Sequence, residues 1–361
     1  MRSQREALCE EEKGGENPSE SVSSLQRFAC CGRPIPIPRR KGVLMDDSNV
    51  VIREVMLRDG LQNVTGFIPT EMKLELFRRI VASGLRDVEF TAFVRPTAVP
   101  QFRDASEVAR AVHAMNLEGV ALSVLVPNLK GAQLALECGV RRLGFVMSVS
   151  ESHNLNNVRR TTAESVDELK RILDQKEAYP DLIVSAGMAA VFGCPFEGKI
   201  SPRVVLQFVR RFYELGVRSI SLADTVGLGN PKEVKEVCRL CTTEFPDITY
   251  SIHLHNTRGL GPANAYAAYE SGIRILDGAI GGLGGCPFAP GARGNTATED
   301  LVYLFESMGI KTGIDIDALL EVARYFQNMN PHIRFASNIL EAGVPKYLGT
   351  ITKDGSEQRW S

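Results

Sequence analysis

The segment His253-Leu254-His255 carries the clearest sign of chemistry in this sequence. Residues i and i+2 of a β-strand point to the same face, so both imidazoles would project from one side of a strand. The whole chain has only five histidines. A single histidine at such a position is more often a satisfied core residue, but two at strand spacing with carboxylates nearby favour a metal site.

Two further residues can complete a set of four protein ligands. Asp59 follows the first expected strand, and Asn295 stands in Gly294-Asn295 after the last one. Nitrogen and hard oxygen donors without thiolate leave room for water and substrate oxygens in an octahedral shell. This donor set suits Mg2+ or Mn2+, and zinc stays an alternative.

Cys286 stands in a segment unusually rich in glycine, with Gly281, Gly282, Gly284 and Gly285 before it. One interpretation is a tight turn with a buried thiol. The other is a mobile lid that carries a reactive thiol over the site and excludes water, with glycine hinges. Spacing alone favours neither.

The elements that must position these residues alternate between short β-rich runs and longer stretches of helical period, which is the pattern of a parallel sheet built from βα units. Eight strands are expected at 51–55, 87–90, 121–126, 143–148, 183–192, 219–224, 249–255 and 275–281. Eight helices are expected at 71–83, 104–115, 129–138, 164–177, 203–215, 232–244, 262–271 and 298–308.

Several of these helices end at a glycine, which supplies a left-handed C-cap before the next strand. Such glycines stand at Gly84, Gly139, Gly216, Gly272 and Gly309. Eight regular repeats favour an α/β fold of the (β/α)8 TIM-barrel type, with extra C-terminal helices after Asp315. A doubly wound open sheet is the alternative, but no G-x-G-x-x-G follows the first strand.

Catalytic groups of such barrels sit at the C-terminal ends of the strands and in the loops that follow. Arg58 and Asp59 follow the first strand, Glu89 lies near the end of the second, and Asp224 ends the sixth. Almost every ionisable residue of note therefore lies at one end of the predicted barrel.

The composition of the chain excludes several classes of protein. Of its 361 residues, 44% are hydrophobic and 24% charged, which supplies a large core and excludes disorder or a collagen-like fibre. The net charge of -1 offers no attraction to nucleic acid or to an anionic membrane. No apolar run approaches the roughly 18 residues of a membrane span.

Eight cysteines without a secretory signal indicate reduced thiols in a cytosolic or organellar compartment. Cys238 and Cys241 have C-x-x-C spacing, but no second ligand pair accompanies them. We interpret them as small, half-buried helical residues rather than as a metal or redox site.

Three regions follow from these patterns. Residues 1–49 combine an acidic cluster with a basic, proline-spaced run, which predicts a disordered leader or targeting segment. Residues 50–345 form the catalytic barrel with its C-terminal helices, and residues 346–361 form a flexible tail. The expected location is cytoplasmic, with a mitochondrial address as the alternative, because the acidic cluster does not suit a transit peptide.

From Val51 to Tyr347 the sequence resembles the 3-hydroxy-3-methylglutaryl-CoA lyases, a family of metal-dependent TIM-barrel lyases related to acyl-CoA condensing enzymes. The most specific match begins at Gly282-Leu283-Gly284-Gly285-Cys286-Pro287-Phe288-Ala289 and continues through Gly294-Asn295. Supporting matches are Arg58-Asp59-Gly60-Leu61-Gln62, Asp224-Thr225-Val226-Gly227 and His253-x-His255.

The resemblance implies a role for each matching residue. The implied metal ligands are Asp59, His253, His255 and Asn295, and the implied catalytic residues are Arg58, Asp59, His253 and Cys286. Substrate binding is implied for Arg58, Gln62 and Glu89, and supporting carboxylates are implied at Asp224 and Glu299. One departure is Asn256-Thr257-Arg258-Gly259 where better-known members have Asp-Thr-Tyr-Gly, which adds a cation near the metal ligands. Two others are Ala92 and Arg293, each in place of a small hydroxyl residue.

The implied activity is a retro-aldol (Claisen-type) cleavage of 3-hydroxy-3-methylglutaryl-CoA to acetoacetate and acetyl-CoA, as in leucine catabolism and ketone-body formation. The expected partners are an acyl-CoA substrate and further copies of the chain in a homo-oligomer, without nucleic acid or membrane. Alternatives are a lyase for another 3-hydroxyacyl-CoA such as citramalyl-CoA, a condensing synthase, which usually appends a sizeable C-terminal domain, and a non-catalytic scaffold, which would have lost a ligand.

Overall fold

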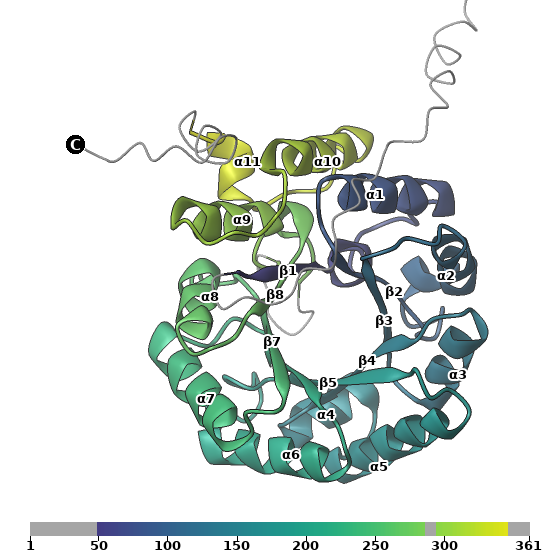
Figure 1. Ribbon diagram of the computed structural model, residues 1–361, viewed down its shortest axis with the longest axis vertical. Helices are drawn as coiled ribbons and strands as arrows, with labels where there is room; N and C mark the ends of the chain where they lie inside the picture. The colour runs from purple at the N-terminus through teal and green to yellow at the C-terminus, as the bar shows by residue number, and fades with distance from the viewer. Residues whose placement is uncertain (1–48, 286–293, 346–361) are drawn as a thin grey trace, which may run out of the picture. The chain divides into compact units, whose positions relative to one another are not determined.

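Eight parallel strands close into a barrel in the order β1 to β8, with β8 paired to β1 (Figure 1). The computed structural model describes residues 49–285 and 294–345. Residues 1–48 of the predicted leader, the predicted tail and Cys286 lie outside these residues, whereas Asn49 pairs with Lys311. The strands are β1 (Val51–Glu54), β2 (Asp87–Ala92), β3 (Ala121–Val126), β4 (Arg142–Ser148), β5 (Ile183–Ala189), β6 (Ser219–Asp224), β7 (Thr249–Leu254) and β8 (Ile275–Gly278).

Helices surround this barrel and bury its outer face (Figure 1). They are α1 (Thr70–Ala82), α2 (Ala105–His113), α3 (Leu129–Glu137), α4 (Glu151–Val158), α5 (Thr162–Leu173), α6 (Pro202–Glu214), α7 (Pro231–Glu244), α8 (Gly261–Tyr269) and α9 (Thr298–Ser307). Two extra helices, α10 (Ile316–Met329) and α11 (Asn338–Ala342), follow. The helix α10 packs on α1 and α9, and α11 packs on α9. The predicted TIM barrel with C-terminal helices is confirmed.

Local chemistry explains where several helices begin and end. The helix α5 starts at a capping box, in which Thr161 and Glu164 exchange hydrogen bonds. The helix α7 starts at Asn230, whose side chain accepts from two backbone N–H groups. All five predicted C-cap glycines have positive φ angles, as expected: Gly84, Gly139, Gly216, Gly272 and Gly309.

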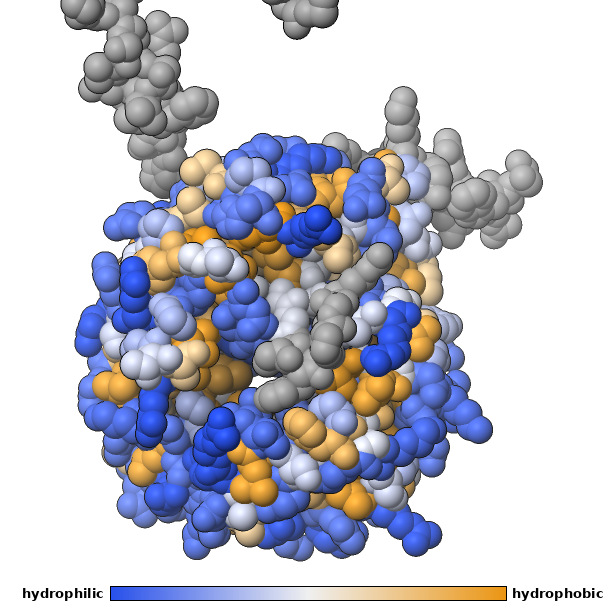
Figure 2. All heavy atoms as spheres, turned by 180° about the vertical axis from the view of Figure 1, so that it is seen from behind, coloured by the Kyte–Doolittle hydropathy of each residue, from blue (hydrophilic) through white to orange (hydrophobic). Residues whose placement is uncertain are grey.

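The inner face of the barrel is unusually open on the side of β3 to β6. TIM-barrel interiors are ordinarily filled by bulky branched side chains. Here the inward positions of β4 to β6 include Gly144, Ser185, Gly187 and Ser221, which line a cavity of about 810 Å3. Seen from behind, the molecule is hollowed at the centre of the barrel (Figure 2). Small inward residues thus leave space inside the barrel for a ligand.

Some predicted boundaries are wrong. The strand β5 ends at Ala189 rather than at residue 192, because Ala190 takes a positive φ of 60°. The strand β8 ends at Gly278, because residues 280–282 form a short 3-10 turn, η4 (Ile280–Gly282), with φ at Gly281 of 68°. The helix α4 was not among the predicted helices; it lies between the expected strand at 143–148 and the expected helix at 164–177.

The C-x-x-C pair was also partly misjudged. Both Cys238 and Cys241 are fully buried in α7, not half-buried. Burial raises the pKa of both thiols, that of Cys241 to about 12. They are therefore inert core residues. Within the described ranges, no helix has the length and apolar character needed to cross a membrane.

Candidate metal centre and active site

Three buried side chains converge at the C-terminal end of the barrel. The Nε2 atoms of His253 and His255 lie 3.2 Å apart, and each lies 3.9 Å from Asp59 Oδ2. His253 stands on β7, His255 follows it, and Asp59 lies in the π-helical turn η1 (Met56–Gly60) after β1. Among the described residues these three form the one group with the geometry of a metal site.

The spacing of these three atoms fits a divalent cation. A point equidistant from them lies about 2.1 Å from each, which is the bond length that Mg2+ forms with oxygen and close to that of zinc with histidine. Without a cation or a proton between them, two imidazole nitrogens and a carboxylate oxygen would present only lone pairs to one another. The donor set therefore indicates a divalent cation site.

Asn295 supports the same conclusion. Its amide nitrogen donates to Asp59 Oδ2 at 2.7 Å and to the Leu283 carbonyl at 2.8 Å. Its Oδ1 atom is buried and has no hydrogen-bond partner in the described part of the chain. A buried polar atom without a partner is rare and costly, so this oxygen fits the fourth ligand that the sequence predicted.

His253 is held from behind by Asp277 on β8. Its Nδ1 atom lies 3.2 Å from Asp277 Oδ2, which leaves Nε2 to face Asp59 and His255. Burial by itself lowers the pKa of His253, but Asp277 and Asp59 outweigh it and raise the pKa. For His255, burial and the neighbouring His253 lower the pKa to about 4. Sequence reasoning missed Asp277, although the expected strand at 275–281 contained it.

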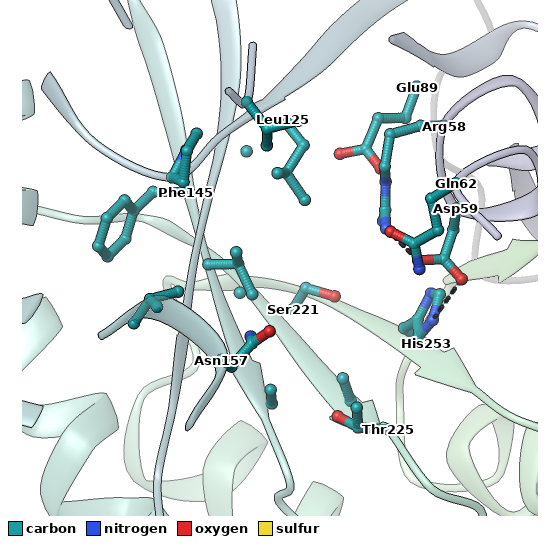
Figure 3. Close-up of a pocket in the computed structure, with 18 of the residues that line it drawn as sticks. Arg58, Asp59, Gln62, Glu89, Leu125, Phe145, Asn157, Ser221, Thr225 and His253 are labelled. Carbon is teal, nitrogen blue, oxygen red and sulfur yellow. Dashed lines mark hydrogen bonds and ion pairs between the residues drawn. The ribbon is translucent and has the colours of Figure 1, made fainter. Parts of the chain in front are cut away.

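Arg58 lies between two carboxylates at the edge of the cluster (Figure 3). Its guanidinium donates to Glu89 and to Asp59 Oδ1, and Gln62 donates to the same Asp59 oxygen at 3.0 Å. Burial by itself raises the pKa of Asp59, but Arg58 and the two histidines hold it well below its usual range. The structure thus brings together Arg58, Asp59, Gln62 and Glu89, as the sequence predicted.

Asp224 and Glu299 stand apart from this cluster. Asp224 accepts from the backbone N–H groups of Leu228 and Gly229, at 2.9 and 3.0 Å. Glu299 accepts from Gly281 N–H at 2.9 Å, and burial raises its pKa to about 8. Each side chain therefore braces a loop beside the site, and neither belongs to the group formed by Asp59, His253 and His255.

The glycine-rich segment begins as a chain of left-handed residues. Gly281, Gly282 and Gly284 have φ angles of 68°, 62° and 96°. A Cβ atom on Gly284 would lie 2.5 Å from Asn295 Nδ2 and 3.1 Å from Asp59 Oδ2, so only glycine fits there. The Cys286 prediction itself lies outside the described residues.

Arg258 bonds to the backbone of the loop after β6. Its guanidinium donates to the carbonyls of Val226 and Gly227, each at 2.9 Å. The side chain is exposed and does not line the cavity. The residue that departs from the family pattern therefore braces the loop after β6, and its effect on the metal ligands stays a prediction.

The cavity reaches from the cluster to residues of the loops that follow the strands. Its lining includes Ser221 and Leu125, which point into it, and Asn157 and Thr225 (Figure 3). Three arginines and an asparagine from the segments after β2, β3 and α4 also line it: Arg95, Asn128, Arg159 and Arg160. A mouth with cations beside a buried metal-ligand cluster suits a long anionic substrate whose reacting end is drawn inside.

The fold is a (β/α)8 barrel, and a buried cluster of two histidines and an aspartate lies at the C-terminal end of its strands. This combination is that of a barrel enzyme with a divalent cation site. The HMGL-like family model matches residues 49–326. The chain therefore belongs to the HMGL-like family and is a lyase-type enzyme of that family, which confirms the resemblance seen in the sequence.

Individual relatives are similar over most of their length. The chain is 40% identical to hydroxymethylglutaryl-CoA lyase YngG of Bacillus subtilis, over 77% of this chain and 92% of the relative. It is 41% identical to (R)-citramalyl-CoA lyase of Chloroflexus aurantiacus, over 75% and 88%. The structure of an HMG-CoA lyase from Acinetobacter baumannii in complex with coenzyme A and 3-methylmalate matches with a TM-score of 0.79 and 40% identity, covering 84% of this chain and 98% of that one.

Proposed function

We propose that the protein cleaves 3-hydroxy-3-methylglutaryl-CoA to acetoacetate and acetyl-CoA, with Mg2+ or Mn2+ as its cation. The observation that carries this proposal is the Asp59, His253 and His255 cluster, which faces the same cavity as Arg58. The names of the relatives at about 40% identity support the substrate. A homo-oligomer is the proposed assembly, and the cytoplasm is the proposed location with the mitochondrion as alternative.

Asp59, His253, His255 and Asn295 would hold the cation. When bound, it supplies a Lewis acid that lowers the pKa of the substrate's tertiary hydroxyl and fixes its orientation. Asp277 keeps the His253 ring in place, and Gln62 and Arg58 occupy the Asp59 oxygen that does not face the histidines. The protein residues therefore fix the ligands before substrate arrives.

The cleavage then moves one electron pair and two protons, one that leaves the substrate hydroxyl and one that is added to the enolate carbon. Asp59 accepts the hydroxyl proton, the oxygen forms a carbonyl, and the bond between C2 and C3 breaks. Of the two candidate bases, His253 is the poorer one, because Asp277 holds its Nδ1 and its Nε2 would hold the cation. The electron pair of that bond passes to the thioester enolate, whose oxygen Arg58 stabilises with its planar guanidinium. Glu89 holds Arg58 in position through its own hydrogen bond. Cys286 would donate a proton to the enolate carbon, which completes acetyl-CoA, and its thiolate would then regain the proton that left the hydroxyl.

Citramalyl-CoA is the second candidate substrate, because a relative of that name is 41% identical to this chain. It would use the same metal ligands and the same Arg58. The two substrates differ in the group at the far end from CoA, so the walls of the cavity decide between them. A condensing synthase would run related chemistry in the opposite direction.

The decisive experiment is a coupled assay of acetyl-CoA release from 3-hydroxy-3-methylglutaryl-CoA, citramalyl-CoA and bulkier analogues, ranked by kcat/KM. Each is assayed with Mg2+, Mn2+, zinc or EDTA. We expect the highest kcat/KM for 3-hydroxy-3-methylglutaryl-CoA and full loss of activity in EDTA. Activity in metal-free enzyme would overturn the metal mechanism, and a higher kcat/KM for citramalyl-CoA would reassign the substrate.

A further inference from the structure

Four charged or ionisable side chains form a connected row across neighbouring strands inside the barrel. Arg53 of β1 is paired in register with Asp87 of β2 and with Asp277 of β8, and Asp277 is paired in register with His253 of β7. Arg53 Nε lies 3.3 Å from Asp87 Oδ1, and its Nη1 lies 3.5 Å from Asp277 Oδ1. The row ends at the His253 ring.

Burying such a row of charged side chains lowers the stability of the fold. Interior layers of a TIM barrel are ordinarily apolar, and a buried ion pair stabilises a fold little better than apolar residues of similar size. The Asp87, His253 and Asp277 residues are all less than one-tenth exposed, and the Arg53 side chain is 12% exposed. Because this buried row adds little stability and ends at His253, we expect its role to lie at that histidine.

The hydrogen bonds around the His253 ring indicate that this role is to orient the ring. A histidine binds metal through one ring nitrogen, and the hydrogen bond at the other nitrogen sets the tautomer and the plane of the ring. Asp277 Oδ2 occupies Nδ1 of His253, so Nε2 faces the cation site. Asp277 Oδ1 is in turn held by Arg53, whose Nη1 also donates to Ser251 Oγ at 3.4 Å. Arg53 thus restrains the carboxylate that restrains the ring.

The second histidine has no such support. His255 Nδ1 is buried and has no hydrogen-bond partner in the described ranges. The two metal-ligating rings therefore differ in how they are held. We propose that Asp277 and Arg53 are positioning residues that pre-orient His253, and only His253, for the divalent cation. This inference rests on the cation site of the proposed function.

The test measures metal affinity directly, by Mn2+ titration of metal-free protein with electron paramagnetic resonance. Asp277→Asn should weaken Mn2+ binding by roughly 10- to 100-fold, the usual effect of losing a carboxylate behind a metal-ligating histidine. Arg53→Met should weaken it less. In the double variant Arg53→Met should add nothing further, because Arg53 acts only through Asp277. Asp87→Asn is the matched control, since Asp87 contacts Arg53 but not His253.

The possible outcomes separate the inference from the proposed function. If native protein does not bind Mn2+, the proposed metal site itself fails. If native protein binds and Asp277→Asn binds equally well, the positioning role is overturned. Equal losses in Asp277→Asn and Asp87→Asn would also overturn it, because they would show a general disturbance of the barrel floor.

A measurement on native protein covers the case in which Asp277→Asn does not fold. Nitrogen-15 labelling of the histidine rings reports which ring nitrogen carries the proton. In the Mg2+-loaded protein, His253 should carry its proton on Nδ1, and this proton should resist exchange with solvent more than any proton on His255. A proton on Nε2 of His253, or an Nδ1 proton that exchanges as fast as that of His255, would contradict the inference.

Discussion

Asn295 donates a 2.7 Å hydrogen bond to Asp59 Oδ2, and this contact joins the turn after the first strand to the segment that follows the last one. The two residues are 236 positions apart in sequence. Gly284 lies against both, since a Cβ atom there would meet Asn295 Nδ2 and the Asp59 backbone. Two of the four candidate metal ligands therefore meet where β8 pairs with β1 and closes the barrel.

Gly284→Ala should weaken Mn2+ binding at least 10-fold, because the new methyl group must displace Asn295 or Asp59. Gly309→Ala is the matched control. Gly309 also has a positive φ, of 75°, but nothing lies within 4 Å of its Cβ position. The control should cost about 1 kcal/mol of stability from the left-handed backbone and leave Mn2+ affinity unchanged. Equal metal affinity in both variants would show that the close approach at Gly284 does not matter.

Replacing His253 or His255 by Ala should abolish activity and leave the barrel folded, because each change removes one cation ligand from a site that other elements already shape. Circular dichroism would check the fold, and Mn2+ titration the ligand loss. Full activity in the double variant would end the metal hypothesis.

Arg58→Lys should lower kcat by roughly 100-fold or more, because a lysine ammonium cannot donate two bonds in one plane to a developing enolate oxygen. The charge between Glu89 and Asp59 is kept, so the melting temperature should change little. A native kcat with a lowered melting temperature would make Arg58 a structural ion-pair residue instead.

Cys286→Ser should retain metal and substrate binding but turn over far more slowly, if the thiol protonates the enolate. Alkylation should inactivate native enzyme, and saturating substrate should protect it. The cysteines that the structure describes should react slowly with the alkylating reagent, because Cys138, Cys194, Cys238 and Cys241 are all buried. Mass spectrometry would locate the modified thiol. Inactivation at the same speed with substrate present would assign Cys286 to a structural role.

Glu299 should make stability depend on pH. Its pKa in the folded protein is raised by burial to about 8, against an ordinary value of 4.5. Between these values the unfolded chain loses the proton while the folded protein keeps it, so the stability gained from this group is full below pH 4.5 and is lost as the pH rises toward 8. Glu299→Gln keeps a neutral side chain that can accept from Gly281.

Urea unfolding at pH 5.5 and 8.5 should therefore show a native protein that loses stability relative to Glu299→Gln as the pH rises. A constant difference between the two proteins would show that Glu299 is ionised in the folded state at both pH values. The comparison between proteins cancels the carboxylates that lie far from Glu299, whose contributions the substitution leaves in place.

The sequence by itself determined the features that depend on neighbours along the chain. The spacing of two residues between His253 and His255 placed both rings on one face of a strand. Arg58 and Asp59 could be assigned to the C-terminal end of the barrel because they directly follow β1. The C-cap glycines marked helix ends correctly, since a positive φ is a local requirement. Eight such repeats then predicted the closed barrel.

Only the tertiary structure decided which strands' side chains meet. Asp277 became the partner of His253 through the register between β7 and β8, and Arg53 became the partner of Asp277 through the register between β1 and β8. Arg258 donates hydrogen bonds to the loop after β6, and Asp224 and Glu299 accept hydrogen bonds from backbone N–H groups beside the site. These contacts depend on how far each strand is shifted against its neighbour when the barrel closes, which no local pattern in the sequence encodes.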